Sequence, residues 1–291
     1  MTFHRASLFN GLLNGMATLG EILMKDRTNP KDILPFLHHV TQQAGKRILS
    51  YYRGNFTVVR KDTSEKGIDI VTDADRASED FILGEITKSF PGHDILTEET
   101  VTEMSGAAWL WLVDPLDGTV NFAHGYPHFS ISIALTRDGG LVAGMVHDPL
   151  RAESFYAFEN QGAFLNGRSI EVSRAETLLT SIVATGFPYN RAYEKDNNVK
   201  EFTQVVTKVQ GIRRAGSAAL DLSYVACGRL DGFWELRLKP WDQGAGMLLV
   251  QEAGGRVSDG KGEPTHVRTS SIVATNGLIH DELVTTLARD S

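Results

Sequence analysis

The chain has 291 residues and a mass of 32.0 kDa, enough for one large domain or two modest ones with a substantial buried core. Hydrophobic residues make up 42% and charged residues 22%, which excludes a disordered or collagen-like chain. The formal charge of -7 is concentrated between Asp69 and Asp117, where twelve acidic residues stand against two basic ones. The acidity is therefore a local feature of this segment.

The longest apolar runs are much shorter than the roughly 20 residues that a bilayer span requires, so no membrane helix is predicted. The single cysteine, Cys227, precludes an intramolecular disulfide and a cysteine metal knuckle, which predicts a reducing, cytoplasmic location. Residues 1–31 are expected to be an N-terminal extension. Residues 32–291 contain no repeat or Pro-rich linker, so we expect them to form one domain.

Hydrophobic periodicity predicts the elements of the first half of the chain. Apolar residues at helical spacing predict a helix from Asp32, a candidate N-cap, to Tyr52, and a second helix over 72–90. A short apolar run predicts a buried strand over 109–113, ended by Asp114 and Pro115. Alternating patterns predict antiparallel strands over 129–136, 141–146, 155–158 and 162–172.

The second half alternates more regularly between helix and strand patterns. Predicted helices cover 199–209, 217–227, 241–252 and 281–288. Predicted strands cover 230–235 and 271–275. Layered helices and sheets in one compact α/β unit are the expected result.

The most informative segment is DPLDGT, residues 114–119, which follows the strand predicted over 109–113. A buried strand would deliver Asp114 and Asp117 to the end of a sheet, where a crevice forms naturally. Two carboxylates there without basic neighbours repel each other, so they either have a raised pKa or hold a cation. Gly118 permits a turn in which the following amides point at a ligand. Taken alone, this spacing also fits an ordinary loop or a helix cap.

Other carboxylates favour the cation. Glu98 and Glu99 follow an apolar pair at a second predicted strand end, and Asp242 lies at a predicted helix start. Asp242 also fits a simple N-cap, and Glu79 fits a solvated helix face. Oxygen ligands without spaced His or Cys pairs suit Mg²⁺ or Mn²⁺ rather than Zn²⁺. Carboxylate clusters of this kind commonly clamp a phosphate through two or three metal ions.

Three motifs contain these carboxylates, and they are EE at 98–99, DPLDGTVNF at 114–122 and WDQGAG at 241–246. With DIVTDAD at 69–75, GSAA at 216–219 and the segment 235–241, they closely resemble the inositol monophosphatase family of Mg²⁺-dependent, lithium-sensitive phosphatases. The resemblance extends from about residue 32 to the C-terminus. It implies a layered αβαβα sandwich with mixed and antiparallel sheets, and a homodimer.

The resemblance also implies a set of metal ligands. The residues matching Glu98 and Asp114 bind a first Mg²⁺, together with the backbone carbonyl at the Leu116 position. Those matching Asp114, Asp117 and Asp242 bind a second Mg²⁺. A weaker third ion lies near Glu98 and water.

Catalytic and substrate-binding roles follow from the same resemblance. The positions of Thr119 and Asp75 polarise the attacking water, and Glu98 is grouped with them as catalytic. The amides of Gly118 and Thr119 hold the phosphate. The hydroxyls of inositol are met by the residues matching Asp117, Gly216, Ser217, Ala218 and Glu235. From the residues alone, Asp75 also fits the second half of a capping box begun by Thr72.

The sequence departs from the family pattern at two places. Thr97 stands before the glutamate pair where the family usually has Gly, and Gly244 replaces a common Ala in the Trp-Asp motif. Neither change removes a ligand. The basic residues that flank the expected substrate-facing segments suit either a solvated surface or a substrate with a second anionic group; they are Arg213, Arg214, Arg237 and Lys239.

The expected activity is Mg²⁺-dependent hydrolysis of a polyol monophosphate, above all myo-inositol 1-phosphate, by direct attack of metal-activated water. The alternatives within this class are fructose 1,6-bisphosphate, histidinol phosphate and 3'-phosphoadenosine nucleotides. A different class of function is binding to a protein or RNA partner. The net acidity argues against broad nucleic-acid affinity, and no membrane partner is expected.

Overall fold

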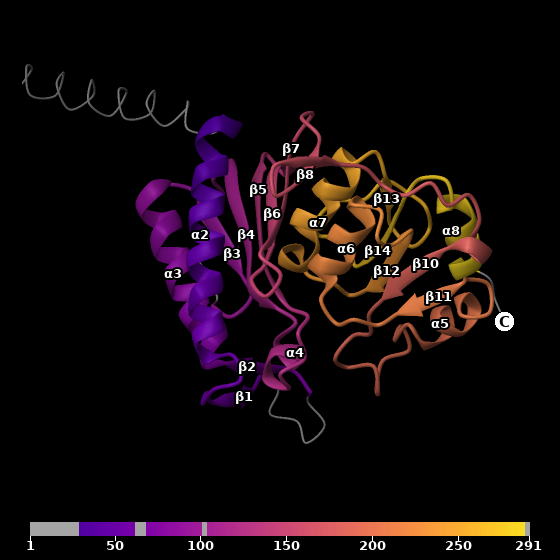
Figure 1. The fold of residues 1–291 in the computed structure, drawn as a ribbon, viewed down its shortest axis with the longest axis horizontal. Coiled ribbons are helices and arrows are strands. Elements are labelled where there is room, and N and C mark those ends of the chain that lie inside the picture. The colour runs from indigo at the N-terminus through magenta and orange to yellow at the C-terminus, as the bar shows by residue number, and fades with distance from the viewer. Residues whose placement is uncertain (1–28, 62–67, 101–103, 289–291) are drawn as a thin grey trace, which may run out of the picture.

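The computed structural model describes residues 29–61, 68–100 and 104–288. Five layers follow one another across the molecule in Figure 1: two helices, a sheet, two helices, a second sheet and two more helices. The predicted α/β sandwich with mixed and antiparallel sheets is therefore confirmed. Most of the predicted extension, residues 1–31, lies outside the described residues.

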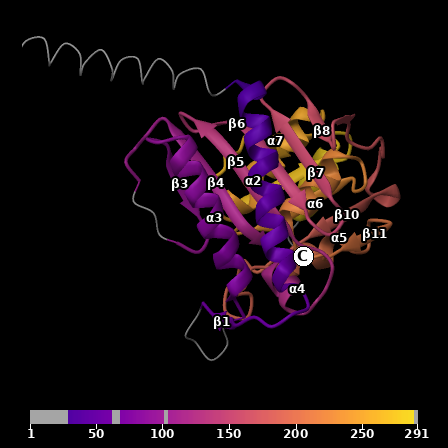
Figure 2. The ribbon, with the colours of Figure 1, turned by 60° about the vertical axis from the view of Figure 1, so that its left-hand side comes forward.

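The first layer consists of α2 (Pro30–Tyr51) and α3 (Asp73–Ser89), which lie side by side over one face of the larger sheet in Figures 1 and 2. The apolar stripe of α2 is buried against α3 and this sheet, as its periodicity predicted. Asp32 is not the N-cap, because the carbonyl of Asn29 already accepts from the amide of Ile33. A carboxylate in the first helical turn still suits the helix dipole.

The larger sheet has seven strands, in the spatial order β3-β4-β5-β6-β7-β8-β9. Only β3 and β4 run parallel, and each later strand pairs antiparallel with the one before it. The strands are β3 (Asp94–Thr97), β4 (Trp109–Asp117), β5 (Ser130–Arg137), β6 (Gly140–Asp148), β7 (Glu153–Phe158), β8 (Ala163–Leu165) and β9 (Arg168–Ile170).

The smaller sheet has five strands in the order β11-β10-β12-β14-β13, with parallel and antiparallel pairs mixed. It contains β10 (Ile182–Thr185), β11 (Gly211–Arg213), β12 (Gly232–Leu236), β13 (Arg256–Ser258) and β14 (Ser271–Thr275). The helices α5 (Val199–Val205) and α8 (His280–Ala288) contact each other and cover its outer face. The inner face meets α6 (Ala218–Ala226) and α7 (Pro240–Glu252), which separate the two sheets.

Three short elements complete the chain. A two-stranded antiparallel ribbon joins β1 (Val58–Arg60) to β2 (Ile70–Thr72), and α4 (Thr119–Ala123) follows the end of β4. A single 3₁₀ turn, η1 (Leu178–Thr180), precedes β10. The ribbon and α4 lie together at one end of the sandwich in Figure 1.

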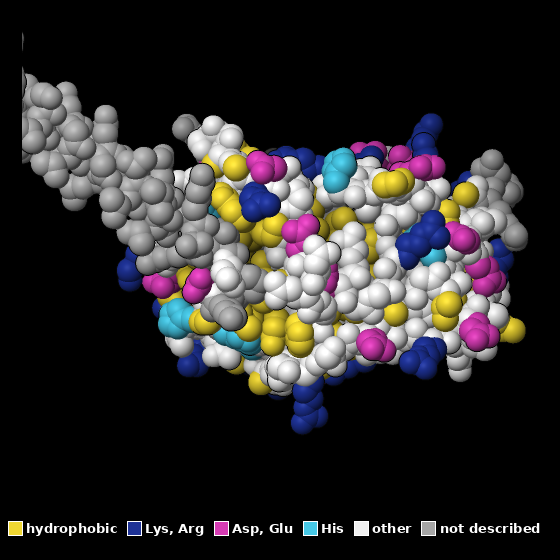
Figure 3. All heavy atoms as spheres, turned by 90° about the horizontal axis from the view of Figure 1, so that it is seen from above, with side chains coloured by type: hydrophobic (Ala, Val, Ile, Leu, Met, Phe, Trp, Pro, Cys, Tyr) yellow, Lys and Arg dark blue, Asp and Glu magenta, His cyan; other side chains and the backbone are white. Residues whose placement is uncertain are grey.

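The surface is mixed in character. On the face shown in Figure 3, Lys and Arg side chains are interspersed with Asp, Glu and hydrophobic ones. Among the described residues, none of the helices has the length and apolar character needed to cross a membrane.

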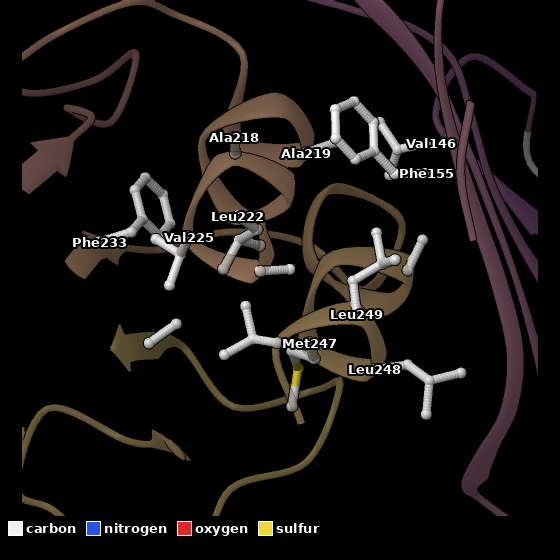
Figure 4. Close-up of a cluster of buried hydrophobic side chains, with 14 of the residues drawn as sticks. Val146, Phe155, Ala218, Ala219, Leu222, Val225, Phe233, Met247, Leu248 and Leu249 are labelled. Atoms are coloured by element: carbon white, nitrogen blue, oxygen red, sulfur yellow. The ribbon is translucent and has the colours of Figure 1, made fainter. Parts of the chain in front are cut away.

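The main core lies between the two sheets, where side chains of α6 and α7 interlock. Leu222 and Val225 of α6 meet Met247 and Leu249 of α7 in Figure 4, and Phe155 of β7 closes the cluster toward the larger sheet. The close approach of the two helices depends on Gly246, where an added Cβ would come within 2.5 Å of Leu222. Helix α7 can therefore pack tightly only with a glycine here.

Several sequence predictions need correction. The strand predicted over 109–113 continues to Asp117, because Asp114 and Asp117 still pair with Ser132 and Ser130 of β5 across an irregularity in the register. The helix predicted over 199–209 is shorter than expected. The strands β1, β2, β10, β11 and β13 were not predicted; each has three or four residues, too few to show a pattern.

The packing at Gly246 yields a test of stability. Gly246→Ala is expected to reduce the free energy of unfolding by about 1–3 kcal/mol, because the new methyl group overlaps with Leu222. The control is Gly84→Ala in α3, where no atom lies within 4 Å of an added Cβ and helix propensity should add about 0.5–1 kcal/mol. Urea unfolding of both variants measures this. Equal effects of the two substitutions would contradict the packing argument.

Candidate active site

A single cleft of about 880 Å³ opens where the loops of both sheets meet. Its wall includes residues from the β1–β2 ribbon, β4, α4, α6, β12 and α7, together with the loops after β3 and β10. Eleven of the twelve site residues named from the sequence line it, and they are Glu98, Asp114, Leu116, Asp117, Gly118, Thr119, Gly216, Ser217, Ala218, Glu235 and Asp242. The twelfth, Asp75, lies fully buried behind this wall.

The end of β4 supplies the two central carboxylates. Asp114 is buried, and its Oδ1 accepts a hydrogen bond of 3.0 Å from the amide of Leu116. Asp117 is also buried, and its Oδ2 accepts from the hydroxyl of Ser217 at 2.5 Å and from the amide of Ala219 at 2.9 Å. Asp117 thus joins the larger sheet to the start of α6.

Gly118 makes the turn between β4 and α4. Its φ of 93° is left-handed, and a Cβ would approach the carbonyl oxygens of His128 and Gly216 to 3.1 and 3.2 Å. Asn121 then fixes the loop, because its side-chain nitrogen donates to the carbonyls of His128 at 2.7 Å and Ala215 at 2.8 Å. Asn121 is therefore an anchor of the loop.

Asp242 comes from the first turn of α7. It is the third helical residue rather than the N-cap, and its Oδ2 accepts from the amide of Lys239 at 2.7 Å. The N-cap interpretation is therefore wrong in position, although the carboxylate does stabilise the helix start. The neighbouring Gly244 has a local reason too, since a Cβ there would lie 2.9 Å from Leu112 of β4.

Asp75 completes a capping box and also contacts Thr119. Its Oδ2 accepts from the amide of Thr72 at 2.7 Å and from the Thr72 hydroxyl at 2.5 Å, which completes a capping box at the start of α3. Its Oδ1 lies 2.8 Å from the hydroxyl of Thr119, which is also 3.0 Å from the carbonyl of Leu116. Burial raises the pKa of Asp75 to about 6. One carboxylate therefore caps a helix and orients a hydroxyl at the cleft.

Glu98 follows β3 and is held by a lysine that sequence reasoning did not single out. The ammonium of Lys61 lies 2.6 Å from Glu98 Oε1 and 2.6 Å from Glu99 Oε1. Burial alone would lower the pKa of Lys61, but the two glutamates raise it well above its usual range. Burial also raises the pKa of Glu99 to about 7, assisted by the charge of Glu98.

Glu79 corrects another sequence interpretation. It is not part of a solvated helix face; it is 2% exposed. Its Oε1 accepts from the hydroxyl of Thr97 at 2.5 Å and from the amides of Glu99 and Thr100 at 3.2 Å. The unusual Thr97 therefore fastens the loop that carries Glu98. The sequence does not distinguish a buried Glu79 from an exposed one, because an acidic residue at this position of α3 fits a solvated helix face equally well.

Glu235 lies at the end of β12, on the side of the cleft away from β3. Burial raises its pKa to about 8, the negative charge of Asp117 adds to this, and the positive charge of Arg214 opposes it. Gly186 makes room for the carboxylate, since a Cβ there would overlap both of its oxygens. Of the four basic residues named from the sequence, Arg214, Arg237 and Lys239 line the cleft, and Arg213 is not among the described lining residues.

The acids of the cleft act on one another. Burial raises the pKa of Asp114 well above its usual range, and the negative charges of Glu98, Asp117 and Asp242 raise it further. Burial and the charge of Glu98 also raise the pKa of Asp242, and burial raises the pKa of Asp117 to about 6. Buried carboxylates that repel one another in this way favour a bound cation.

The donor chemistry fits a hard divalent cation, because carboxylate oxygens and the Leu116 carbonyl are available and sulfur is absent among the described lining residues. Within the described ranges, no three His, Cys, Asp or Glu side chains already surround a common point closely enough to hold a metal ion. These carboxylates would have to rotate to hold an ion together, and Glu98 already contacts Lys61.

Known proteins can now be compared with this geometry. The profile of the inositol monophosphatase family matches residues 29–291. An inositol-1-monophosphatase from Synechocystis is 44% identical over 266 residues, which is 89% of this chain and 91% of that protein. A protein named Nus factor SuhB from Pseudomonas aeruginosa is 46% identical over 224 residues, covering 75% of this chain and 83% of that protein.

Solved structures give the same result. The inositol monophosphatase of Anabaena superposes with a TM-score of 0.79 and 41% identity over 88% of this chain and 96% of that one. The SuhB protein of Bartonella henselae superposes with a TM-score of 0.82 and 38% identity, over 89% and 99% of the two chains. With its fold, its cleft and these relatives in agreement, the chain belongs to the inositol monophosphatase family, a family of metal-dependent phosphatases.

Proposed function

We propose that this protein hydrolyses the phosphate monoester of a polyol, above all myo-inositol 1-phosphate, with Mg²⁺ as its cofactor and Mn²⁺ as a substitute. The observation that carries the proposal is the meeting of Glu98, Asp114, Asp117 and Asp242 in one cleft with the half-buried Glu235 on its other side. Family membership supports a phosphatase. The homodimer and the cytoplasmic location remain predictions.

The proposed metal ligands are Glu98, Asp114, Asp117, Asp242 and the Leu116 carbonyl, for two or three ions. Bound Mg²⁺ supplies a Lewis acid that lowers the pKa of water and neutralises charge on the phosphoryl oxygens. The remaining chemistry belongs to the chain.

Thr119 is the residue that we propose orients the attacking water. When its hydroxyl proton is donated to Asp75, 2.8 Å away, the oxygen keeps lone pairs that can accept a hydrogen bond from water. Glu98 completes this catalytic group. The amides of Gly118 and Thr119 would hold the phosphate, because the left-handed turn at Gly118 brings the chain to the cleft wall.

The polyol part of the substrate would lie toward α6 and β12. Asp117 and Glu235 offer carboxylate oxygens to hydroxyl groups, and Gly216, Ser217 and Ala218 form the adjoining wall. The Glu235 carboxyl group can hydrogen-bond a hydroxyl group, which favours a hydroxyl-rich substrate at this end. Arg214 and Arg237 on the same wall keep fructose 1,6-bisphosphate as the main rival, with histidinol phosphate and 3'-phosphoadenosine nucleotides behind it.

A panel of phosphate esters tests the substrate. Phosphate release is expected to be fastest from myo-inositol 1-phosphate, to cease with a chelator and to return with added Mg²⁺ or Mn²⁺. The panel includes fructose 1,6-bisphosphate, histidinol phosphate and a 3'-phosphoadenosine nucleotide. A preference of at least tenfold for any of these rivals would overturn the choice of substrate. Activity that persists in the chelator would overturn the metal requirement.

Asp117→Asn tests the carboxylate cluster. The substitution removes one charge without changing volume, so we expect kcat to fall by roughly 100-fold or more while the fold is kept. The matched control is Asp94→Asn, which changes a buried aspartate outside the cleft. The Asp94 carboxylate accepts hydrogen bonds from Ser105, Gly106 and Ala107. Steady-state kinetics and circular dichroism measure both. Wild-type rates in Asp117→Asn would refute the proposed site.

A second candidate function is binding to RNA or RNA polymerase, which the likeness to proteins named Nus factor SuhB favours. The charge of -7 and the interspersed charges of Figure 3 weigh against a broad nucleic-acid surface. We expect the purified protein to show metal-dependent phosphatase activity and no stable association with RNA or polymerase in a binding assay. Stable association without any phosphatase activity would reverse this ranking.

A further inference from the structure

The wall of the cleft holds a carboxyl group for which the proposed function has no use. Asp221 lies in α6, is 2% exposed and lines the cleft. It follows Ala218 by three residues and Ser217 by four, so the helix brings all three to the same face. Neither the motifs nor the metal chemistry gave this residue a role.

The side chain of Asp221 has no hydrogen-bond partner within the part of the chain that the structure describes. His128 Nε2 lies 4.0 Å from Asp221 Oδ1, which is too long for a direct hydrogen bond. His128 Nε2 is itself buried and has no partner there either. Two unpaired polar groups facing each other beside a cleft indicate a site for a further hydrogen-bonding group.

His128 is held in place by one backbone contact and one ring contact. Its backbone carbonyl accepts from Asn121 at 2.7 Å, and its ring meets Tyr224 edge-to-face with the centroids 5.9 Å apart. Burial lowers the pKa of His128 to about 4, and the charge of Arg151 adds to this. The ring is therefore neutral near pH 7 and does not form an ion pair with Asp221.

The surroundings of Asp221 are those of the polyol end. Burial raises the pKa of Asp221, the negative charges of Glu235 and Asp117 raise it further, and the charge of Arg214 opposes them. Because the charges of Glu235 and Asp117 both act on it, Asp221 lies near the residues that would contact the alcohol part of the substrate. A carboxyl group can bind a hydroxyl in either protonation state.

We propose that Asp221 binds a hydroxyl of the substrate beside Glu235 and thereby selects hydroxyl-rich phosphate esters over esters that lack hydroxyls. The inference rests on the proposed phosphatase function and adds a specificity-determining residue to it. Without a substrate hydroxyl the buried Asp221 carboxyl group stays unpaired, which is the physical source of the discrimination.

The test compares two substrates with Asp221→Ala and Asp221→Asn. For myo-inositol 1-phosphate, Asp221→Ala is expected to lower kcat/KM by about tenfold, mainly through KM, as for the loss of one hydrogen bond. For 4-nitrophenyl phosphate, which has no hydroxyl on its leaving group, the change should stay within about twofold. Asp221→Asn should keep most of the activity on both esters, because an amide can still bind a hydroxyl.

Ser223→Ala is the matched control, since Ser223 is a buried polar residue of the same helix whose hydroxyl bonds the carbonyl of Ala219. It should leave the ratio of the two substrates unchanged. Equal losses on both esters in Asp221→Ala, or no loss on either, would refute the role of Asp221 alone. Wild-type protein that hydrolyses neither ester with Mg²⁺ would refute the proposed function, and this inference with it.

Discussion

The mutual repulsion of buried and half-buried carboxylates is the constraint on which the rest of this molecule depends. Glu98, Asp114, Asp117 and Asp242 come from the loop after β3, from β4 and from α7, and burial together with like charge raises the pKa values of the three aspartates. Such an arrangement is unfavourable unless the surrounding structure holds it in place. Most of the local features of the cleft can be understood as means of holding these charges together.

Each carboxylate is held by a contact that also orders the fold. Asp117 accepts from the start of α6, Asp242 from the start of α7, and Asp75 from the start of α3. Besides their proposed role at the cleft, these carboxylates therefore stabilise helix ends. Lys61 plays the corresponding part for Glu98 with its own positive charge. Stability and the proposed chemistry draw on the same side chains, so a substitution at one affects both.

The sequence was sufficient where the signal is local. The strand-end aspartates, the helix that begins near Ser217 and the layered fold follow from periodicity and from motifs of a few residues. It was insufficient where a role depends on partners distant in the chain. Nothing near Glu79 indicates that it binds the loop after β3, and nothing near Gly186 shows that the Glu235 carboxylate occupies the space above it. Lys61 was missed because its two glutamate partners, Glu98 and Glu99, lie 37 residues or more further on.

Asn121 has a mechanical consequence for how a ligand reaches the cleft. Its amide is bonded to the segment before β5, which belongs to the larger sheet, and to the segment before α6, which belongs to the layer beneath the smaller one. Asn121 therefore links the two walls of the cleft. Moving the sheets apart at this point would break both hydrogen bonds, so ligand entry without such a movement is favoured.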